Sequence, residues 1–130
     1  MSGDDLRNSL HGFIGGSGEW HTYSPLFSWA LLTDGAKYLA ENAGGGAYWL
    51  MDLICSHQPE IRKRHPERYF FQVWTLDVKP DQSCVATCND GDGFVMVRQE
   101  IEWSDFPLET IKLYASWEDN YLVIYLPVER

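Results

Sequence analysis

The sequence predicts an α+β fold in which N-terminal helices pack on a C-terminal antiparallel β-meander of four to five strands. Helix caps and helix formers gather before residue 58, whereas the chain after residue 68 is aromatic, β-branched and rich in strand patterns. Turn residues separate these strands by short links, and strands joined in this way pair antiparallel. We expect one domain over residues 1–130, with 1–19 as an extension that is either flexible or separately packed.

The first predicted element is a short helix over residues 4–10, with Ser2 as its cap and acidic residues in its first turn. The glycines that follow predict a loop. A second glycine group occupies positions 44–46. Neither group has the lysine of a phosphate-binding P-loop or opens a helix after a clear strand, so both are expected to be linkers or caps. The glycines of the first loop are Gly12, Gly15, Gly16 and Gly18.

Two more helices are predicted before residue 58. An apolar run at 26–32 ends at Thr33 and Asp34, either of which can cap the helix formers at 36–42. The glycines at 44–46 stop this helix. The next helix begins near Ala47 and ends near His57, and it is expected to be buried because it is apolar almost all round. The charged stretch 59–68 then predicts a short helical turn or loop.

Five segments after residue 68 show strand patterns, and one of them alternates clearly. Val95, Val97 and Ile101 share one face of that strand, and charged residues occupy the other. The loop before it holds two aspartates and two glycines, which predicts a hairpin rather than a calcium-binding loop because no helix flanks it. The predicted strands cover residues 69–79, 83–88, 94–103, 111–117 and 121–126.

Composition and charge restrict the class of partner. The chain has 130 residues, of which 45% are hydrophobic and 15% aromatic, enough for a core and for an exposed aromatic patch. Its net charge is −9, and residues 69–130 carry −7 of it. Direct binding to nucleic acid is therefore not expected. The basic segment 59–68 is the one place where an anion or an acidic protein would dock naturally.

The sequence also predicts a cytoplasmic location without a membrane partner. Its first residues are acidic where a signal peptide would be basic, and its apolar runs fall short of the roughly 20 residues that span a bilayer. Three cysteines, an odd number without secretory features, favour free thiols in a reducing compartment.

No residue pattern predicts a catalytic site, a metal or a cofactor. Cys84 and Cys88 point to one face of a strand but lie roughly 13 Å apart, too far for a disulfide or for joint zinc ligation, so we expect both to be small core residues. Cys55, on the buried helix, is interpreted in the same way. The four histidines lie on loops or element ends, and no hydrolase or metalloprotease motif accompanies them.

Ten residues are the candidates for a binding surface. The acidic ones have a spacing that either imitates a row of phosphates or simply solvates one face of the sheet. The basic ones form either a solvated connector or half of a binding surface, and two tryptophans are candidate anchors. These residues are Glu100, Glu102, Asp105, Asp90, Asp92, Trp103, Trp117, Arg62, Lys63 and Arg64.

Several segments together resemble an uncharacterised family of small proteins from bacteria, plasmids and phages, described only as a domain of unknown function. The likeness covers roughly residues 20–127, and the glycine-rich N-terminus departs from it. The resemblance implies a mobile-element setting but supplies no activity and no functional residues. The segments that carry it are 33–40, 46–52, 71–74, 87–91 and 105–114.

The function that these observations favour is a small acidic, non-enzymatic protein-binding module. In a mobile element it would inhibit a host nucleic-acid-binding or defence protein by occupying its basic groove. The alternative is a self-associating structural protein that pairs an exposed edge strand at 121–126 with its copy, so the chain is either a monomer or a homodimer. The least favoured hypothesis is a small hydrolase, which needs a pocket that joins His57 with Asp52, or Glu100 with a histidine.

Overall fold

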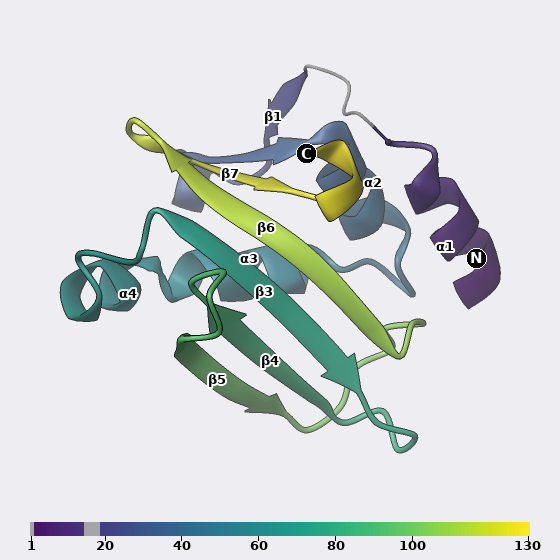
Figure 1. The fold of residues 1–130 in the computed structure, drawn as a ribbon. Helices are drawn as coiled ribbons and strands as arrows, with labels where there is room; N and C mark the ends of the chain where they lie inside the picture. Colours follow the sequence, from purple (N-terminus) through teal and green to yellow (C-terminus); the bar gives the residue numbers. More distant parts are fainter. Residues whose placement is uncertain (1, 15–18) are drawn as a thin grey trace.

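The computed structural model describes residues 2–14 and 19–130, and in this part the chain builds one seven-stranded sheet (Figure 1). The loop glycines at 15, 16 and 18 lie outside the described residues. The elements are helices α1 (Gly3–His11), α2 (Asp34–Asn42), α3 (Tyr48–Ser56) and α4 (Gln58–Arg64), strands β1 (Trp20–Thr22), β2 (Ala30–Thr33), β3 (Phe71–Val78), β4 (Cys84–Asn89), β5 (Val95–Ile101), β6 (Thr110–Glu118) and β7 (Tyr121–Tyr125), and the 3₁₀ turns Pro25–Phe27 and Pro127–Glu129.

The predicted fold class is wrong in the size and the topology of its sheet. The strand order is β1-β2-β7-β6-β3-β4-β5, so the sheet has seven strands rather than four to five, and they do not form a simple meander. The hairpins β3–β4, β4–β5 and β6–β7 are antiparallel as expected. However, β6 pairs with β3 instead of β5, and β2 pairs parallel with β7, which makes the sheet mixed.

The two extra strands come from the half of the chain in which only helices were predicted. The apolar run at 26–32 holds part of β2, whose residues Ala30 and Leu32 are fully buried. A short, continuously apolar run lacks the alternation that identifies a strand, so periodicity alone does not distinguish it from a buried helix. Its position depends instead on β7, about 90 residues further along the chain: Leu32 pairs with Ile124.

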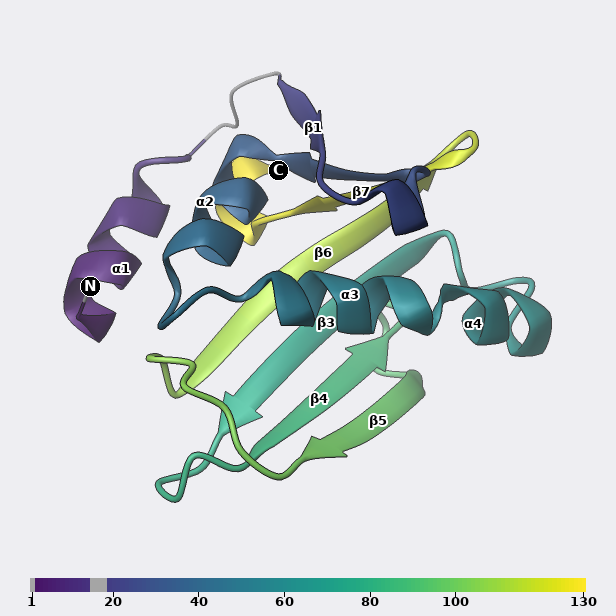
Figure 2. The ribbon, with the colours of Figure 1, turned by 180° about the vertical axis from the view of Figure 1, so that it is seen from behind.

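The predicted helices are present. Ser2 and Thr33 cap α1 and α2 by accepting hydrogen bonds from the backbone N–H groups of Asp5 and Ala36. Figures 1 and 2 show that α3 lies across one face of the sheet, whereas no described helix crosses the opposite face. Among the described residues, no helix is long and apolar enough to cross a membrane.

Alternation along the central strands fills the core on the helical side. Trp74 and Leu76 of β3 are buried there, and Thr75 between them is partly exposed on the open face. Cys84 and Cys88 of β4 follow the same pattern, and together with Cys55 they are buried and unpaired. The prediction that these cysteines are small core residues is confirmed.

A buried polar network joins α4 to the sheet. The side-chain amides of Gln58 and Gln72 are almost fully buried and donate to each other over 2.8 Å. Trp74 Nε1 donates to Gln72 Oε1 and Trp117 Nε1 to Gln58 Oε1, at 2.9 and 3.1 Å. Since buried amides are costly when unpaired, these partners fix where α4 sits.

Candidate functional site

Five exposed carboxylates gather where β3 turns into β4 and where the chain leaves β5 for β6, at the lower end of the sheet in Figure 1. Lys79 is the basic residue in these two connections. Two backbone hydrogen bonds hold the connections together, from Val78 to the Glu109 carbonyl at 2.8 Å and from Ser104 to the Gln82 carbonyl at 2.9 Å. We call this region the acidic end; its carboxylates are Asp77, Asp81, Glu102, Asp105 and Glu109.

Trp103 projects from the acidic end into solvent. Its side chain is 65% exposed, although the next residue, Ser104, is buried, as is Phe106. Ser104 Oγ accepts from the Phe106 N–H at 3.1 Å and contacts Cys84 Sγ at 3.2 Å, and the Gln82 side chain donates to the Ser104 carbonyl at 2.9 Å. The indole is therefore exposed on a segment that is anchored immediately beside it.

The carboxylates of the acidic end differ in whether they already accept hydrogen bonds within the protein. Asp105 accepts a hydrogen bond from the Gly45 N–H at 2.6 Å, which ties the β5–β6 connection to the loop between α2 and α3. Hydrogen bonds from the Ser83 hydroxyl and N–H lower the pKa of Asp81 and keep it charged. Glu102, beside Trp103, is exposed.

A pocket of about 370 Å³ opens at the same end of the sheet. It lies between the β3–β4 turn, which contributes Lys79 and Pro80, and the β5–β6 connection, which contributes Pro107 and Glu109. The acidic end thus combines an exposed indole, a concave surface and a strong excess of negative charge.

The other acidic candidates do not join this group. Asp90 and Asp92 lie in the hairpin at the opposite end of β4 and β5. Backbone hydrogen bonds from Asp92 and Phe94, with an ion pair to Arg68 at 2.6 Å, lower the pKa of Asp90, so its carboxylate organises the turn. Glu100 lies on β5 and contacts Arg98 at 3.2 Å. The five acidic candidates therefore do not form one continuous row.

Of the basic candidates, the structure brings Arg62 together with Trp117. The Arg62 guanidinium lies 4.8 Å from the Trp117 ring centre and 4.9 Å from that of Tyr69. Trp29 stacks on Trp117 at 5.5 Å, and a pocket of about 370 Å³ lies beside these side chains. Lys63 is exposed on α4, and Arg64 forms an ion pair with Glu60 one turn earlier.

Among the described residues, the members of the two pairs considered for a hydrolase, His57 with Asp52 and Glu100 with a histidine, have other partners. His57 Nε2 hydrogen-bonds to Gln99 Oε1 at 2.6 Å, whereas Asp52 accepts from the Tyr23 hydroxyl at 3.3 Å. Tyr23 also donates to Cys55 Sγ at 3.2 Å. Burial raises the pKa of the Cys55 thiol to about 12, so this cysteine is not an activated nucleophile.

Sequence reasoning missed one group of three side chains of the kinds that bind metal ions. Donor atoms of Glu19, His21 and Asp34 lie within 4.8 Å of one another, and His21 Nε2 contacts Asp34 Oδ1 directly. One imidazole and two carboxylates would suit zinc. The signal in the sequence is the spacing of Glu19 and His21, which lie two residues apart at the start of β1. A hydrogen bond between His21 and Asp34 accounts for their approach without a metal.

Comparison with known proteins identifies the family without naming an activity. Neither the curated proteins nor the solved structures contain a match to the chain. The model of one family, described as a family of unknown function (DUF6876), matches residues 4–130. Because this match includes every helix and strand except the first residue of α1, the chain belongs to that family.

Proposed function

We propose that the protein is a non-enzymatic binding module that docks a partner protein on the acidic end of its sheet, with Trp103 as the anchor. The observation that carries the proposal is the exposed indole on an anchored segment. Tryptophan is enriched among residues that dominate binding energy, and a pre-ordered side chain loses little conformational entropy on binding. The surrounding carboxylates select a basic partner surface.

The class of partner follows from the charge of this surface. A basic groove that normally holds nucleic acid is complementary to a cluster of carboxylates, whereas nucleic acid itself would be repelled. The mobile-element setting implied by the family resemblance makes a host nucleic-acid-binding or defence protein the proposed target, and inhibition in the cytoplasm the proposed outcome. Steering by charge would make the association rate fall as salt increases.

The test is an affinity purification from the native host with matched tryptophan variants. Trp103→Ala should lose a partner that the unmodified protein recovers at near-stoichiometric yield, because a hot-spot side chain contributes about 2 kcal/mol or more. Trp20→Ala is the control, since Trp20 is 54% exposed on edge strand β1, away from the acidic end. Glu102→Lys should weaken the same association.

The recovered partner then tests the proposed inhibition directly. Its binding to nucleic acid should be blocked by the unmodified protein and by Trp20→Ala, but not by Trp103→Ala. Retention of the partner by Trp103→Ala, or recovery of no partner, would refute docking through the acidic end.

Self-association is a second candidate, but not through the strand first expected. The prediction that 121–126 is an edge strand is wrong, because β7 pairs with β6 on one side and β2 on the other. The longer edge strand among the described residues is β5. Antiparallel pairing of two β5 strands centred on Gln99 would place Arg98 opposite Glu100 of the second copy, a favourable cross-strand pair.

Exchanging the charges of Arg98 and Glu100 tests whether the chain forms this β5-paired dimer or stays a monomer. Light scattering at increasing concentration should show a dimer that Arg98→Glu abolishes and that Arg98→Glu combined with Glu100→Arg restores. A monomer at all concentrations, or a dimer that the single variant leaves intact, would exclude pairing through β5.

A further inference from the structure

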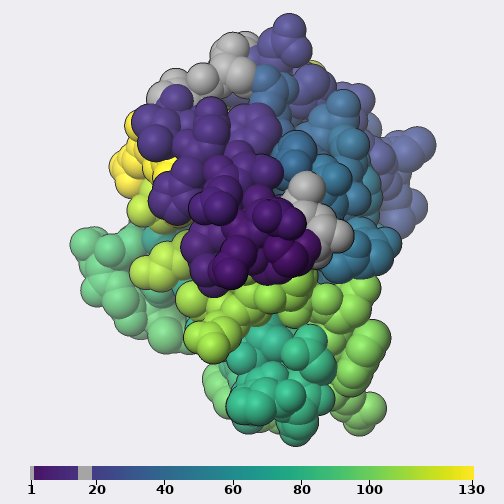
Figure 3. Space-filling model, turned by 90° about the vertical axis from the view of Figure 1, so that its right-hand side faces the viewer, coloured from purple at the N-terminus to yellow at the C-terminus, as the bar shows by residue number. Residues whose placement is uncertain are grey.

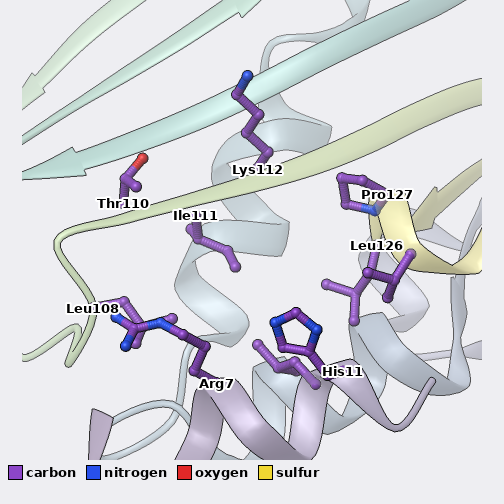
Figure 4. Close-up of a pocket in the computed structure, with 10 residues that line it drawn as sticks. Arg7, His11, Leu108, Thr110, Ile111, Lys112, Leu126 and Pro127 are labelled. Carbon is purple, nitrogen blue, oxygen red and sulfur yellow. The ribbon is translucent and has the colours of Figure 1, made fainter. Parts of the chain in front are cut away.

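A groove of about 280 Å³ lies between α1 and the first half of β6, closed at one side by residues 126–128 (Figure 4). Figure 3, which faces α1, shows this helix directly against the yellow-green chain that leads into β6. The contact is close, because a Cβ added to Gly3 would lie 2.8 Å from the Pro107 carbonyl oxygen. We call this feature the β6–α1 groove.

The groove exists because β6 continues beyond the end of its neighbour. β6 pairs with β3 from Thr110 to Ser116, but its pairing with β7 covers only Tyr114 to Glu118. After Tyr125 the chain turns into a 3₁₀ helix. On that side, the first residues of β6 have helix α1 as their neighbour in place of a strand.

The register of β6 shows which backbone groups face the groove. The Glu109 carbonyl accepts from Val78 and the Trp117 N–H donates to Phe70, so the odd-numbered residues of this stretch direct their backbone groups toward β3. Successive residues in an antiparallel ladder bond to alternate sides. The backbone N–H and C=O groups of Thr110 and Lys112 therefore face the groove, positioned to pair with an added strand.

Side chains supply an apolar floor and a positive rim. Leu10, Leu108, Ile111 and Leu126 line the floor, and Figure 4 shows Ile111 directed toward Arg7 and His11 while Lys112 extends from the opposite side of the strand. None of the described residues that line the groove is acidic, in a chain with a net charge of −9. Arg7 contacts Asp4 at 3.1 Å, but both side chains are largely exposed, and such a pair is weak.

We infer that the β6–α1 groove binds the C-terminal end of an extended peptide whose last residue is apolar. The peptide backbone pairs with Thr110 and Lys112, its last side chain occupies the floor, and its carboxylate lies against Arg7 and His11. Backbone pairing supplies affinity in such strand addition, and the pocket supplies specificity. This surface is separate from the acidic end, so the inference does not depend on the proposed function.

The test uses the full chain and an N-terminally fluorescein-labelled pentapeptide, Ser-Thr-Ser-Val-Leu, with a free carboxylate. Fluorescence anisotropy should show binding that weakens about tenfold or more when the carboxylate is amidated or the last leucine is replaced by serine, since hydrogen bonds to charged groups and buried leucine side chains each contribute at that level. Methylation of the leucine nitrogen should also weaken binding, because it removes a strand hydrogen bond.

Variants and probes locate the site. Arg7→Ala combined with His11→Ala should weaken binding about tenfold, whereas Arg98→Ala, an exposed base on the far edge strand, should not. Amide resonances of residues 110–112 should shift on titration. The inference fails if the amidated peptide binds equally well, if the shifts map elsewhere, or if no binding occurs at millimolar peptide. It also fails if octanoate, which cannot pair as a strand, binds as tightly as the peptide.

Discussion

At the scale of single residues, burial raises the pKa of three side chains: Cys55 on α3, Cys88 on β4 and Tyr23 beside Cys55. Burial raises the pKa values of both Cys55 and Cys88 from the ordinary value of 9.0 to about 12. Burial also raises the pKa of Tyr23, whose hydroxyl lies 3.2 Å from Cys55 Sγ. These groups remain protonated in the folded chain at a pH at which the unfolded chain loses its protons.

The free energy of unfolding should therefore fall under alkaline conditions. Above pH 9 the unfolded state binds fewer protons than the native state, so stability decreases until the pH approaches the native pKa of about 12. Each thiol contributes a slope of roughly 1.4 kcal/mol per pH unit in that window. Guanidinium unfolding from pH 7.5 to 10.5 measures the slope, and Cys88→Ala should reduce it. A constant free energy over this range would contradict the burial of these thiols.

The Gln58–Gln72 pair gives a second prediction at this scale. Gln72→Leu should destabilise the protein by about 2–3 kcal/mol, because it leaves the buried Trp74 N–H without its acceptor and removes both hydrogen bonds that join the Gln58 amide to Gln72. Gln58→Leu combined with Gln72→Leu should cost less than the sum of the two single losses, because each single change already breaks the hydrogen bonds between the two amides. Thr75→Val, on the open face of the same strand, is the control in urea unfolding. Equal destabilisation by Gln72→Leu and Thr75→Val would argue against the network.

At the scale of elements, the start of α2 is held by a residue from the other end of the chain. Glu129 accepts from the Gly35 N–H at 3.1 Å and from the Thr33 hydroxyl at 2.6 Å, and its own 3₁₀ turn is closed by a hydrogen bond from the Leu126 N–H at 2.8 Å. A carboxylate at a helix N-terminus is favourable because it meets unpaired N–H groups and the positive end of the helix dipole.

Glu129→Ala should therefore lower the free energy of unfolding by about 2 kcal/mol, the combined size of a lost cap and lost charge-assisted hydrogen bonds. Glu118→Ala is the matched control, since Glu118 is an exposed carboxylate at the end of β6. Thermal and urea unfolding provide the measurement. Equal stability of the two variants would mean that Glu129 does not cap α2.

The capping of α2 also shows what sequence reasoning can reach. Thr33 was recognisable as a cap because the signal lies within four residues of the helix, and the same holds for Ser2 and for the hairpin around Asp90. Glu129 carries no local signal, because its role depends on where the 3₁₀ turn Pro127–Glu129 packs in the folded chain. The candidate site divides in the same way. Trp103, Glu102 and Asp105 were predicted from residue type and spacing, but their grouping with Asp81 and Glu109 depends on the strand order.

At the scale of the whole molecule, the position of β7 explains why the chain is not a helical half joined to a sheet half. β7 lies between β2 from the first half and β6 from the second, and Ile124 pairs with residues of both strands. A parallel pairing across about 90 residues leaves no pattern in either segment, which is why the two halves seemed separable in the sequence. The real division is between the helical face and the open face of one sheet.

This arrangement predicts a single cooperative unfolding transition that responds to changes in β7. Ile124 is fully buried, and Ile124→Ala should cost about 2–5 kcal/mol because it leaves a cavity between the helices and the sheet. The helices, followed by circular dichroism, and strands β3–β5, followed by hydrogen exchange, should lose stability together, since both depend on the same sheet. Val85→Ala, on the open face of β4, is the control and should cost far less. If Ile124→Ala destabilises α2 while β3–β5 keep their protection, β7 does not couple the two halves, and a binding surface on β5 would be independent of the N-terminal strands.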